Sequence, residues 1–262
     1  MIKISKILIT IDLHLVNMSF SVILPTLNEK GHILNLIYEI SKTFENRNTQ
    51  YEIILVDDSS TDGTFEIVEN EKKKLNFLKT ISRKTLKRNL ASSLNDGIKK
   101  AKFEFIIWMD ADFQHPPKYI KNFIDLSKDY DAIISSRFLE KSERYFNFDN
   151  SIKDINENQS YFFNQLCRRF LYKDITDYTS GFICIRKSIF NNYSLKGFYG
   201  DYFVNLIVFL KNNNKNIFEI PFKDEQRATG ISKTLVSLNF RYLYTCLRYA
   251  LTFVTCLLNK KF

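Results

Sequence analysis

Short apolar runs alternate along this chain with stretches in which apolar residues recur at helical spacing. The run at 20–24 is followed by Pro25, which favours its end there, and then by Ile33, Ile37, Ile40 and Phe44 at steps of four, three and four. The same alternation predicts strands at 51–56, 103–109 and 131–135 and helices near 64–76 and 117–129. Strands that alternate with helices indicate an α/β fold, with a mostly parallel sheet and helices on both faces.

The segment 140–159 interrupts this alternation. It is polar and rich in asparagine, without a clear period. Such a composition predicts a loop, and the order of the strands puts this loop near the active site.

The segment 234–259 predicts a long C-terminal helix with one polar stripe. The stripe consists of Thr234, Ser237, Arg241, Thr245, Arg248, Thr252, Thr255 and Asn259. A central arginine disfavours a membrane span, because it costs about 2.5 to 3.5 kcal/mol on insertion scales. We expect one of two arrangements: a helix in the membrane interface with Arg241, Arg248, Lys260 and Lys261 toward the headgroups, or a helix packed on the domain or on a second subunit.

These patterns divide the chain into three parts. Residues 1–17 form an N-terminal arm, which Asp12 and His14 make a poor signal peptide. Residues 18–233 form one α/β domain. Residues 234–262 form the amphipathic C-terminal segment, and membrane association is one of the two arrangements expected for it. A length of 262 residues suffices for one such domain with a modest extension.

Composition narrows the choice of partners. With 45% hydrophobic and 26% charged residues the chain has the composition of a folded protein. A net charge of +9 favours anionic partners, namely nucleotide phosphates, acidic lipids or nucleic acid. The basic runs at 72–74 and 83–88 lack a nucleic-acid-binding motif, which disfavours nucleic acid. Four cysteines without a CxxC pair indicate a reducing compartment and ordinary packing roles.

Carboxylates follow two of the predicted strands. Ligands of open α/β sheets bind beyond the carboxyl ends of the strands. Asp57 and Asp58 follow one strand and can accept hydrogen bonds from a ribose or a base. Asp110 and Asp112 follow another, and because alternate side chains of an extended segment point the same way, they can converge on one divalent cation that also binds diphosphate oxygens.

Several motifs occur together in a specific order. They are PTLNE (25–29), VDDSSTDGT (56–64), DADFQHPP (110–117), SSR (135–137), DYTSGF (177–182) and RATGISK (227–233). In this combination the chain resembles the family-2 glycosyltransferases of the GT-A fold, most closely the dolichyl- or polyprenyl-phosphate glycosyltransferase branch. The resemblance spans about residues 19–235 and implies a Rossmann-like GT-A domain.

The resemblance also implies roles for individual residues. Pro25, Glu29 and Asp58 would contact the nucleotide. Mg²⁺ or Mn²⁺ would be held by Asp110, Asp112 and Gln114. The groups around the acceptor phosphate and the donor diphosphate would be Arg137, Ser160 and Arg227, with Lys233 as a further phosphate contact. The chain departs from the polyprenyl-phosphate enzymes at Asn156, where they carry an arginine.

Two acceptors remain open at this point. Transfer in this family inverts the anomeric centre by direct displacement, from a UDP- or GDP-sugar among other donors. A polyprenyl phosphate needs no general base, since its oxygen is already anionic. A sugar hydroxyl on a growing glycan needs a carboxylate to take its proton, for which Asp201 is the candidate. In either case we expect an enzyme peripheral to the cytoplasmic face of a membrane.

Overall fold

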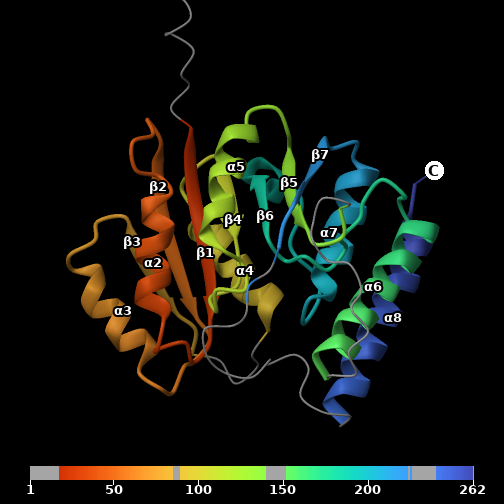
Figure 1. The fold of residues 1–262 in the computed structure, drawn as a ribbon, viewed down its shortest axis with the longest axis horizontal. Coiled ribbons are helices and arrows are strands. Elements are labelled where there is room, and N and C mark those ends of the chain that lie inside the picture. The colour runs from red at the N-terminus through yellow and green to blue at the C-terminus, as the bar shows by residue number, and fades with distance from the viewer. Residues whose placement is uncertain (1–17, 85–88, 140–151, 224, 226–239, 262) are drawn as a thin grey trace, which may run out of the picture.

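The computed structural model describes residues 18–84, 89–139, 152–223, 225 and 240–261. In this part of the chain the strands form one seven-stranded sheet in the order β3-β2-β1-β4-β6-β5-β7 (Figure 1). Every neighbouring pair is parallel except the two that involve β6. The prediction of a mostly parallel α/β sheet is confirmed.

The strands and helices have the following bounds. The strands are Ser19–Thr26 (β1), Gln50–Asp57 (β2), Leu78–Ser82 (β3), Phe105–Trp108 (β4), Ala132–Ser136 (β5), Ile183–Arg186 (β6) and Ile217–Pro221 (β7). The α-helices are Ile33–Lys42 (α2), Thr64–Lys72 (α3), Leu90–Lys100 (α4), Ile120–Leu126 (α5), Ile152–Phe170 (α6), Asp201–Asn212 (α7) and Phe240–Asn259 (α8). Two 3₁₀ helices are Pro117–Tyr119 (η1) and Lys187–Asn191 (η2).

Two apolar clusters cover the two faces of the sheet. On one face α2, α3 and α5 pack against alternate strand residues such as Val22, Leu24 and Ile53. On the other face α4, α6, α7 and α8 pack against residues such as Ile23 and Ile54. Adjacent residues of one strand therefore belong to opposite clusters, as the two-residue period of a strand requires.

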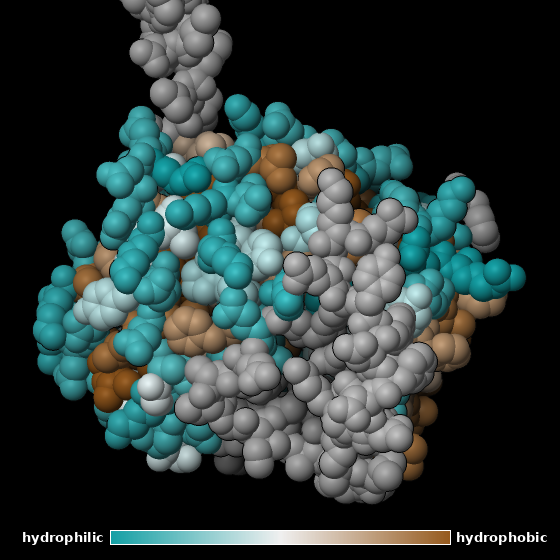
Figure 2. Space-filling model, viewed as in Figure 1, coloured by the Kyte–Doolittle hydropathy of each residue, from teal (hydrophilic) through white to brown (hydrophobic). Residues whose placement is uncertain are grey.

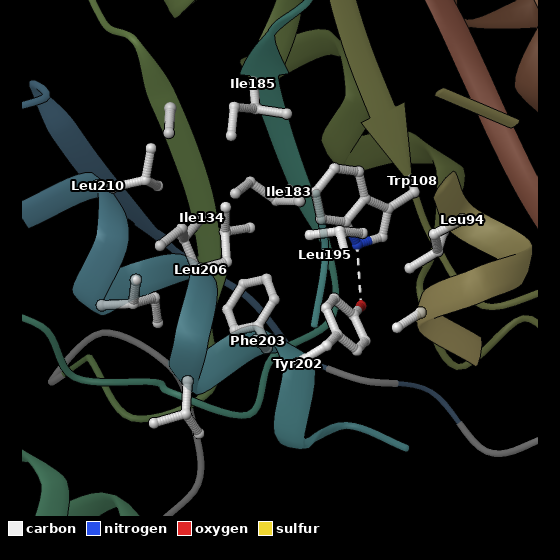
Figure 3. Close-up of a cluster of buried hydrophobic side chains, with 14 of the residues drawn as sticks. Leu94, Trp108, Ile134, Ile183, Ile185, Leu195, Tyr202, Phe203, Leu206 and Leu210 are labelled. Carbon is white, nitrogen blue, oxygen red and sulfur yellow. Dashed lines mark hydrogen bonds between the residues drawn. The ribbon is translucent and has the colours of Figure 1, made fainter. Parts of the chain in front are cut away.

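Helix α7 supplies much of the second cluster. Phe203, Leu206 and Leu210 point from α7 toward Ile134 of β5 and Ile183 of β6 (Figure 3). At the edge of this cluster the indole Nε1 of Trp108 donates a hydrogen bond to the Tyr202 hydroxyl over 3.0 Å. Burial and then the charge of Asp110 raise the pKa of Tyr202, so its phenol stays neutral and can accept this bond. The end of β4, which precedes the candidate metal loop, is thereby fixed to α7.

Two sequence predictions differ from the structure. The segment 140–159 was expected to be a loop, but residues 152–159 belong to α6. Its first eight residues are mostly polar and so show no apolar period in the sequence, while its later turns bury Asn164 and Cys167 against the domain. Cys246 is exposed on α8, whereas the other three cysteines are buried as expected and all four are free. Residues 1–17 lie outside the described residues.

A glycine sets the distance between α4 and the sheet. A Cβ atom on Gly97 would lie 2.6 Å from Cγ2 of Ile23 and 3.2 Å from Cγ2 of Val56. Gly97→Ala is expected to destabilise the protein by about 1 to 3 kcal/mol through overpacking, although alanine favours a helix. Urea unfolding would measure this, and the cost of Gly97→Ala should be smaller when it is measured in an Ile23→Ala background than in the wild type. A variant as stable as the wild type would contradict the close packing.

Candidate active site

The carboxyl ends of β2, β1 and β4 meet at one edge of the sheet, because these strands are parallel neighbours. The loops after β1 and β2 are joined by hydrogen bonds. Asn28 N donates to Ser60 Oγ over 2.9 Å, Thr61 N donates to Asn28 Oδ1 over 2.8 Å, and Glu29 N donates to Thr64 Oγ1 over 2.9 Å. The structure thus brings Glu29 beside the loop that carries Asp57 and Asp58.

Asp57 presents a buried acceptor at this edge. Its Oδ2 accepts from Ser60 N over 2.9 Å. Its Oδ1 is buried and receives no hydrogen bond from the described residues. Because an unsatisfied buried acceptor costs about 1 to 3 kcal/mol, Asp57 Oδ1 is suited to a donor on a bound molecule. Pro25 lies within β1, pairing with Val56 of β2 immediately before Asp57.

Asp58 is held by a neighbouring arginine that the sequence did not indicate. Arg83 Nη1 donates to Asp58 Oδ1 over 2.7 Å, and Arg83 Nε donates to Asp96 over 2.9 Å. The backbone N–H of Asn89 donates to the other oxygen of Asp58 over 3.2 Å. Asp58 is therefore fixed in orientation at the edge of the sheet.

The candidate metal loop follows β4. Asp110 is half-buried, while Asp112 is buried and its Oδ1 accepts from Gln114 N over 3.0 Å. Two carboxylates and an amide oxygen suit a hard divalent cation such as Mg²⁺ or Mn²⁺. Among the described residues no three His, Cys, Asp or Glu side chains form a metal site by themselves. A cation bound here would accordingly need further oxygen ligands, for example from a diphosphate.

Arg137 and Ser160 come together beyond the end of β5. Arg137 donates from Nε to Asp177 Oδ2 over 2.8 Å and from Nη2 to Asp177 Oδ1 over 2.9 Å. Arg137 Nη2 also donates to Thr179 Oγ1 over 2.7 Å, and Thr179 Oγ1 lies 3.1 Å from Ser160 Oγ. Burial alone would raise the pKa of Asp177, but Arg137 and two backbone N–H groups outweigh it and lower this pKa. Arg227 and Lys233 lie outside the described residues.

Glu219 of β7 supports the same segment from behind. It accepts hydrogen bonds from Thr176 N over 2.8 Å and from Asp177 N over 3.0 Å. Burial raises the pKa of Glu219 to about 7, and hydrogen bonds to Thr176 and Asp177 only partly offset this. The segment that carries Asp177 therefore rests on a carboxyl group that is protonated more readily than usual.

The raised pKa of Glu219 predicts a specific pH dependence of stability. Between its ordinary pKa of 4.5 and its folded value of about 7, the folded state binds this proton more tightly than the unfolded state. The stabilisation is complete below pH 4.5 and is lost as the pH rises toward 7. Glu219→Gln should flatten this slope in urea unfolding measured across the range. An unchanged slope in the variant would contradict the prediction.

Asp201 begins α7 in the interior of the protein. It is fully buried, and its Oδ1 accepts from the backbone N–H groups of Phe198 and Tyr199, each over 2.8 Å. Its Oδ2 lies 3.3 Å from Arg248 Nη2 and 3.3 Å from Thr252 Oγ1, both on α8. Asp201 thus holds the segment that precedes α7 and attaches α8 to the domain.

The middle of the polar stripe of α8 faces the domain, whereas Thr255 and Asn259 of the stripe are exposed. Thr245 and Thr252 are buried, and Arg248 pairs with Asp201, so the expectation that Arg248 faces lipid headgroups is wrong. The reason is that the buried Asp201 carboxylate needs a cationic partner. The opposite face is apolar and exposed, and in Figure 2 brown atoms follow the edge where α8 lies. This exposed apolar face consists of Leu243, Leu247, Leu251, Val254 and Leu258. None of the described helices combines the length and apolar character of a membrane span.

The chain is similar to several known proteins. The family model described as glycosyl transferase family 2 matches residues 21–194. The chain belongs to this family. A dolichol-phosphate mannosyltransferase from Pyrococcus furiosus is 31% identical over 229 residues, which are 86% of this chain and 62% of that protein. This family-2 glycosyltransferase chain therefore spans less than two thirds of the length of that relative.

Two further proteins are similar to this chain, one to about a third of it in sequence and one to most of it in structure. The poly(ribitol-phosphate) β-N-acetylglucosaminyltransferase TarS from Staphylococcus aureus is 38% identical over 95 residues, 36% of this chain and 16% of TarS. Glucosyl-3-phosphoglycerate synthase from Mycobacterium tuberculosis, solved with Mn²⁺, UDP and glucosyl-3-phosphoglycerate, has a TM-score of 0.65 at 14% identity. That match covers 91% of this chain and 80% of the synthase chain, and it supports the GT-A fold.

Several residues that shape the transferase site were not singled out from the sequence. His115 and Asp177 lie inside the motifs DADFQHPP and DYTSGF. The motifs indicated that these segments belong to the site, but they gave neither residue a function. Arg83 belongs to a basic run that had suggested nucleic acid. In the structure Arg83 pairs with Asp58 and Asp96. Lys72 and Lys74 pair with two glutamates of α3. These pairs reduce the charge available to nucleic acid.

Proposed function

We propose that this transferase moves a sugar, with inversion, from a nucleotide-sugar donor to a polyprenyl phosphate at a membrane surface. The observation that carries the proposal is the environment of Asp201. Its carboxylate lies in the interior with four donors around it, two backbone N–H groups, Arg248 and Thr252. A carboxylate so occupied is poorly placed to take a proton from a sugar hydroxyl. An anionic phosphate acceptor needs no such base.

The acceptor phosphate would be received by the cluster of Arg137, Ser160 and Thr179. Arginine suits a phosphate because it is always positively charged and carries five N–H donors. Nε and Nη2 of Arg137 bind Asp177 and Thr179, so this pair would fix the guanidinium in place and leave its charge to attract the phosphate. Arg227 and Lys233 would add positive charge from the sequence-predicted motif. The printed name of the Pyrococcus relative, a dolichol-phosphate mannosyltransferase, agrees with this acceptor class.

The donor would lie across the ends of β2, β1 and β4. Asp57 Oδ1, a buried acceptor, and the fixed carboxylate of Asp58 would accept hydrogen bonds from the base or ribose, with Pro25 and Glu29 beside them. Asp110, Asp112 and Gln114 would hold Mg²⁺ or Mn²⁺. When bound, the cation would supply positive charge that stabilises the departing nucleoside diphosphate. The fold relative binds Mn²⁺ with UDP, and another structure of it contains Mg²⁺ with UDP.

The chemistry would then be one displacement. An oxygen of the acceptor phosphate attacks the anomeric carbon as the bond from that carbon to the donor diphosphate breaks. The acceptor phosphate loses one negative charge and the nucleoside diphosphate gains one, so no proton moves. Arg137 orients the attacking phosphate, and the carboxylates at the strand ends hold the donor in line.

A glycan hydroxyl is the second candidate acceptor. The similarity to TarS over 95 residues favours it, since the name of TarS indicates transfer to poly(ribitol phosphate). This function would require a carboxylate at the acceptor. If Asp201 is that carboxylate, it must leave Arg248 and Thr252 on substrate binding.

Release of nucleoside diphosphate from a panel of UDP- and GDP-sugars with Mn²⁺ tests the proposal. Polyprenyl phosphate should stimulate release and should carry the radiolabelled sugar afterwards. Stimulation by a glycan or poly(ribitol phosphate) but not by the lipid phosphate would overturn the lipid acceptor in favour of the hydroxyl. No release from any donor under these conditions would contradict the whole assignment.

Peripheral attachment to the cytoplasmic face of a membrane is part of the proposal. It is supported by the exposed apolar face of α8, where Leu243 is 66% and Leu258 80% exposed, and by four free cysteines, which suit a reducing compartment. Buried apolar side chains contribute about 1.5 to 3 kcal/mol each when fully buried. Leu251→Ser with Leu258→Ser should therefore weaken vesicle binding at least about tenfold.

Sedimentation with vesicles that contain anionic phospholipid measures this binding. The matched control is Tyr38→Ser, which removes an exposed apolar side chain from α2 on the other side of the sheet. The control should bind vesicles as the wild type does. Equal binding by the α8 variant would contradict membrane attachment through this face.

A further inference from the structure

Two histidines contact the backbone of the candidate metal loop from different directions. His115 Nδ1 lies 2.9 Å from Asp110 N, and His32 Nε2 lies 2.9 Å from Ala111 O. A backbone N–H can only donate and a carbonyl can only accept. His115 therefore accepts through an unprotonated Nδ1, whereas His32 donates through a protonated Nε2. The two contacts hold the peptide group that precedes Asp110 and the peptide group that joins Ala111 to Asp112.

We propose that His115 and His32 are positioning residues that set the conformation of the loop 110–114 before a cation binds. They act through the peptide backbone and not as metal ligands. The inference rests on the proposed function for the cation, but the order of the loop can be measured without it.

The imidazole of His115 is itself fixed by packing. It is 5% exposed and stacks on Phe182, with ring centroids 5.0 Å apart and planes 13° apart. Phe222 meets it edge-on at 5.6 Å. Both phenylalanines are buried beside the ends of β6 and β7. An acceptor held this rigidly can hold the Asp110 N–H in one place.

His32 links the metal loop to the loop that follows β1. It is 5% exposed at the start of α2, and its Nε2 lies 3.0 Å from Glu29 Oε2 as well as near Ala111 O. Glu29 is a candidate nucleotide contact. One side chain thus fixes the spacing between a residue expected to bind the nucleotide and the residues expected to bind the cation.

The loop needs such contacts because its backbone is strained. Phe113, between Asp112 and Gln114, has φ of +67°, in the left-handed region that side chains other than glycine rarely adopt. Such conformations persist where the surrounding structure fixes them. Besides the two histidine contacts, Gln114 N donates to Asp112 Oδ1. The loop is therefore organised for its ligands by its neighbours.

His115 and His32 use different ring nitrogens, so asparagine and glutamine should have opposite effects at the two positions. Asparagine places Oδ1 where histidine has Nδ1, and glutamine places Nε2 where histidine has Nε2. His115→Asn should therefore keep the contact to Asp110 N that His115→Gln and His115→Phe lose. His32→Gln should keep the contact to Ala111 O that His32→Asn loses. His115→Phe retains aromatic packing and so serves as the control for packing alone.

Hydrogen exchange of the peptide around 109–115 in metal-free protein reports the order of the loop. The affinity for Mn²⁺ reports the effect of this order on cation binding. It is measured in the presence of UDP or GDP from the electron paramagnetic resonance signal of free Mn²⁺. His115→Phe and His32→Asn should exchange faster and bind Mn²⁺ about tenfold to 100-fold more weakly, the range seen for residues that orient ligands. His115→Asn and His32→Gln should remain close to the wild type.

The outcomes separate this inference from the proposed function. Wild-type exchange and Mn²⁺ affinity in His115→Phe would indicate packing alone and would overturn the inference. Equal losses in all five variants would overturn it as well, because the losses would then not depend on which ring nitrogen is replaced. If the wild type binds no Mn²⁺, the proposed metal dependence fails, while the crossed exchange pattern still decides whether the histidines order the loop.

Discussion

Asp112→Asn is expected to lower the rate of nucleotide-sugar turnover by a factor of about 10² to 10³ while leaving the protein folded. Asparagine keeps the volume of the side chain and an Oδ1 that can accept from Gln114 N, a bond of 3.0 Å in the wild type. It removes the negative charge that a cation requires. Lewis-acid stabilisation is worth several kcal/mol, and each 1.36 kcal/mol is a factor of ten in rate.

Two measurements test this prediction. Steady-state release of nucleoside diphosphate gives the turnover rate, and the thermal unfolding temperature shows whether the variant is folded. The matched control is Asp125→Asn on α5, where the carboxylate is 62% exposed and forms a surface ion pair with Arg47. Such pairs are worth about 0 to 1 kcal/mol, so the control should keep both activity and stability. An Asp112→Asn variant with activity within threefold of the wild type would show that this carboxylate does not serve the reaction.

Asp177→Ala is expected to destabilise the fold by about 3 to 5 kcal/mol, because it leaves the Arg137 guanidinium without its buried partner. The Asp177 side chain is fully buried, and Arg137 is 16% exposed. For a domain of this size the loss corresponds to about 6 to 20 °C in unfolding temperature. Transfer to the acceptor should fall as well, since Arg137 would lose the contacts that orient it.

Thermal unfolding and a comparison of KM for the acceptor with KM for the donor test this prediction. Asp174→Ala removes a carboxylate that is 56% exposed and pairs with Lys211 at the surface, so it should cost less than about 1 kcal/mol. The acid side of the stability curve gives a second check. The lowered pKa of Asp177 contributes stability above its ordinary pKa of 3.8, which is lost as the pH falls below that value. A small effect at Asp177 would contradict the buried pair.

Several elements of the first half of the fold could be predicted because their strands are continuous apolar runs, whereas β3 and α4 were not predicted. The runs at 20–24, 51–56 and 131–135 correspond to β1, β2 and β5. Helix α2 contains Ile33, Ile37 and Ile40, three of the four residues at helical spacing, and Phe44 lies just beyond its end. The later elements were harder. Strand β6 has four residues, and the first turns of α6 are polar, so neither has a distinct period. Their burial depends on neighbours far along the chain.

For the candidate site, the sequence indicated the residues but not their partners. Asp58, Asp112 and Arg137 were expected at strand ends, and the structure describes them there. Arg83 is 25 positions from Asp58, and Asp177 is 40 positions from Arg137. His32 contacts Ala111, the neighbour of Asp112, from 79 positions away. Motif spacing gives no information on such pairings.

The sequence by itself determined the class of fold, the family resemblance and the acidic residues at the carboxyl ends of the strands, because these follow from local periodicity and from motifs in fixed order. Only the tertiary structure decided which way α8 faces and what Asp201 contacts. A helix with one polar and one apolar stripe can bury either stripe. Here the buried carboxylate of Asp201 needs Arg248 and Thr252 as donors, so this part of the polar stripe faces the domain and the leucines remain outside.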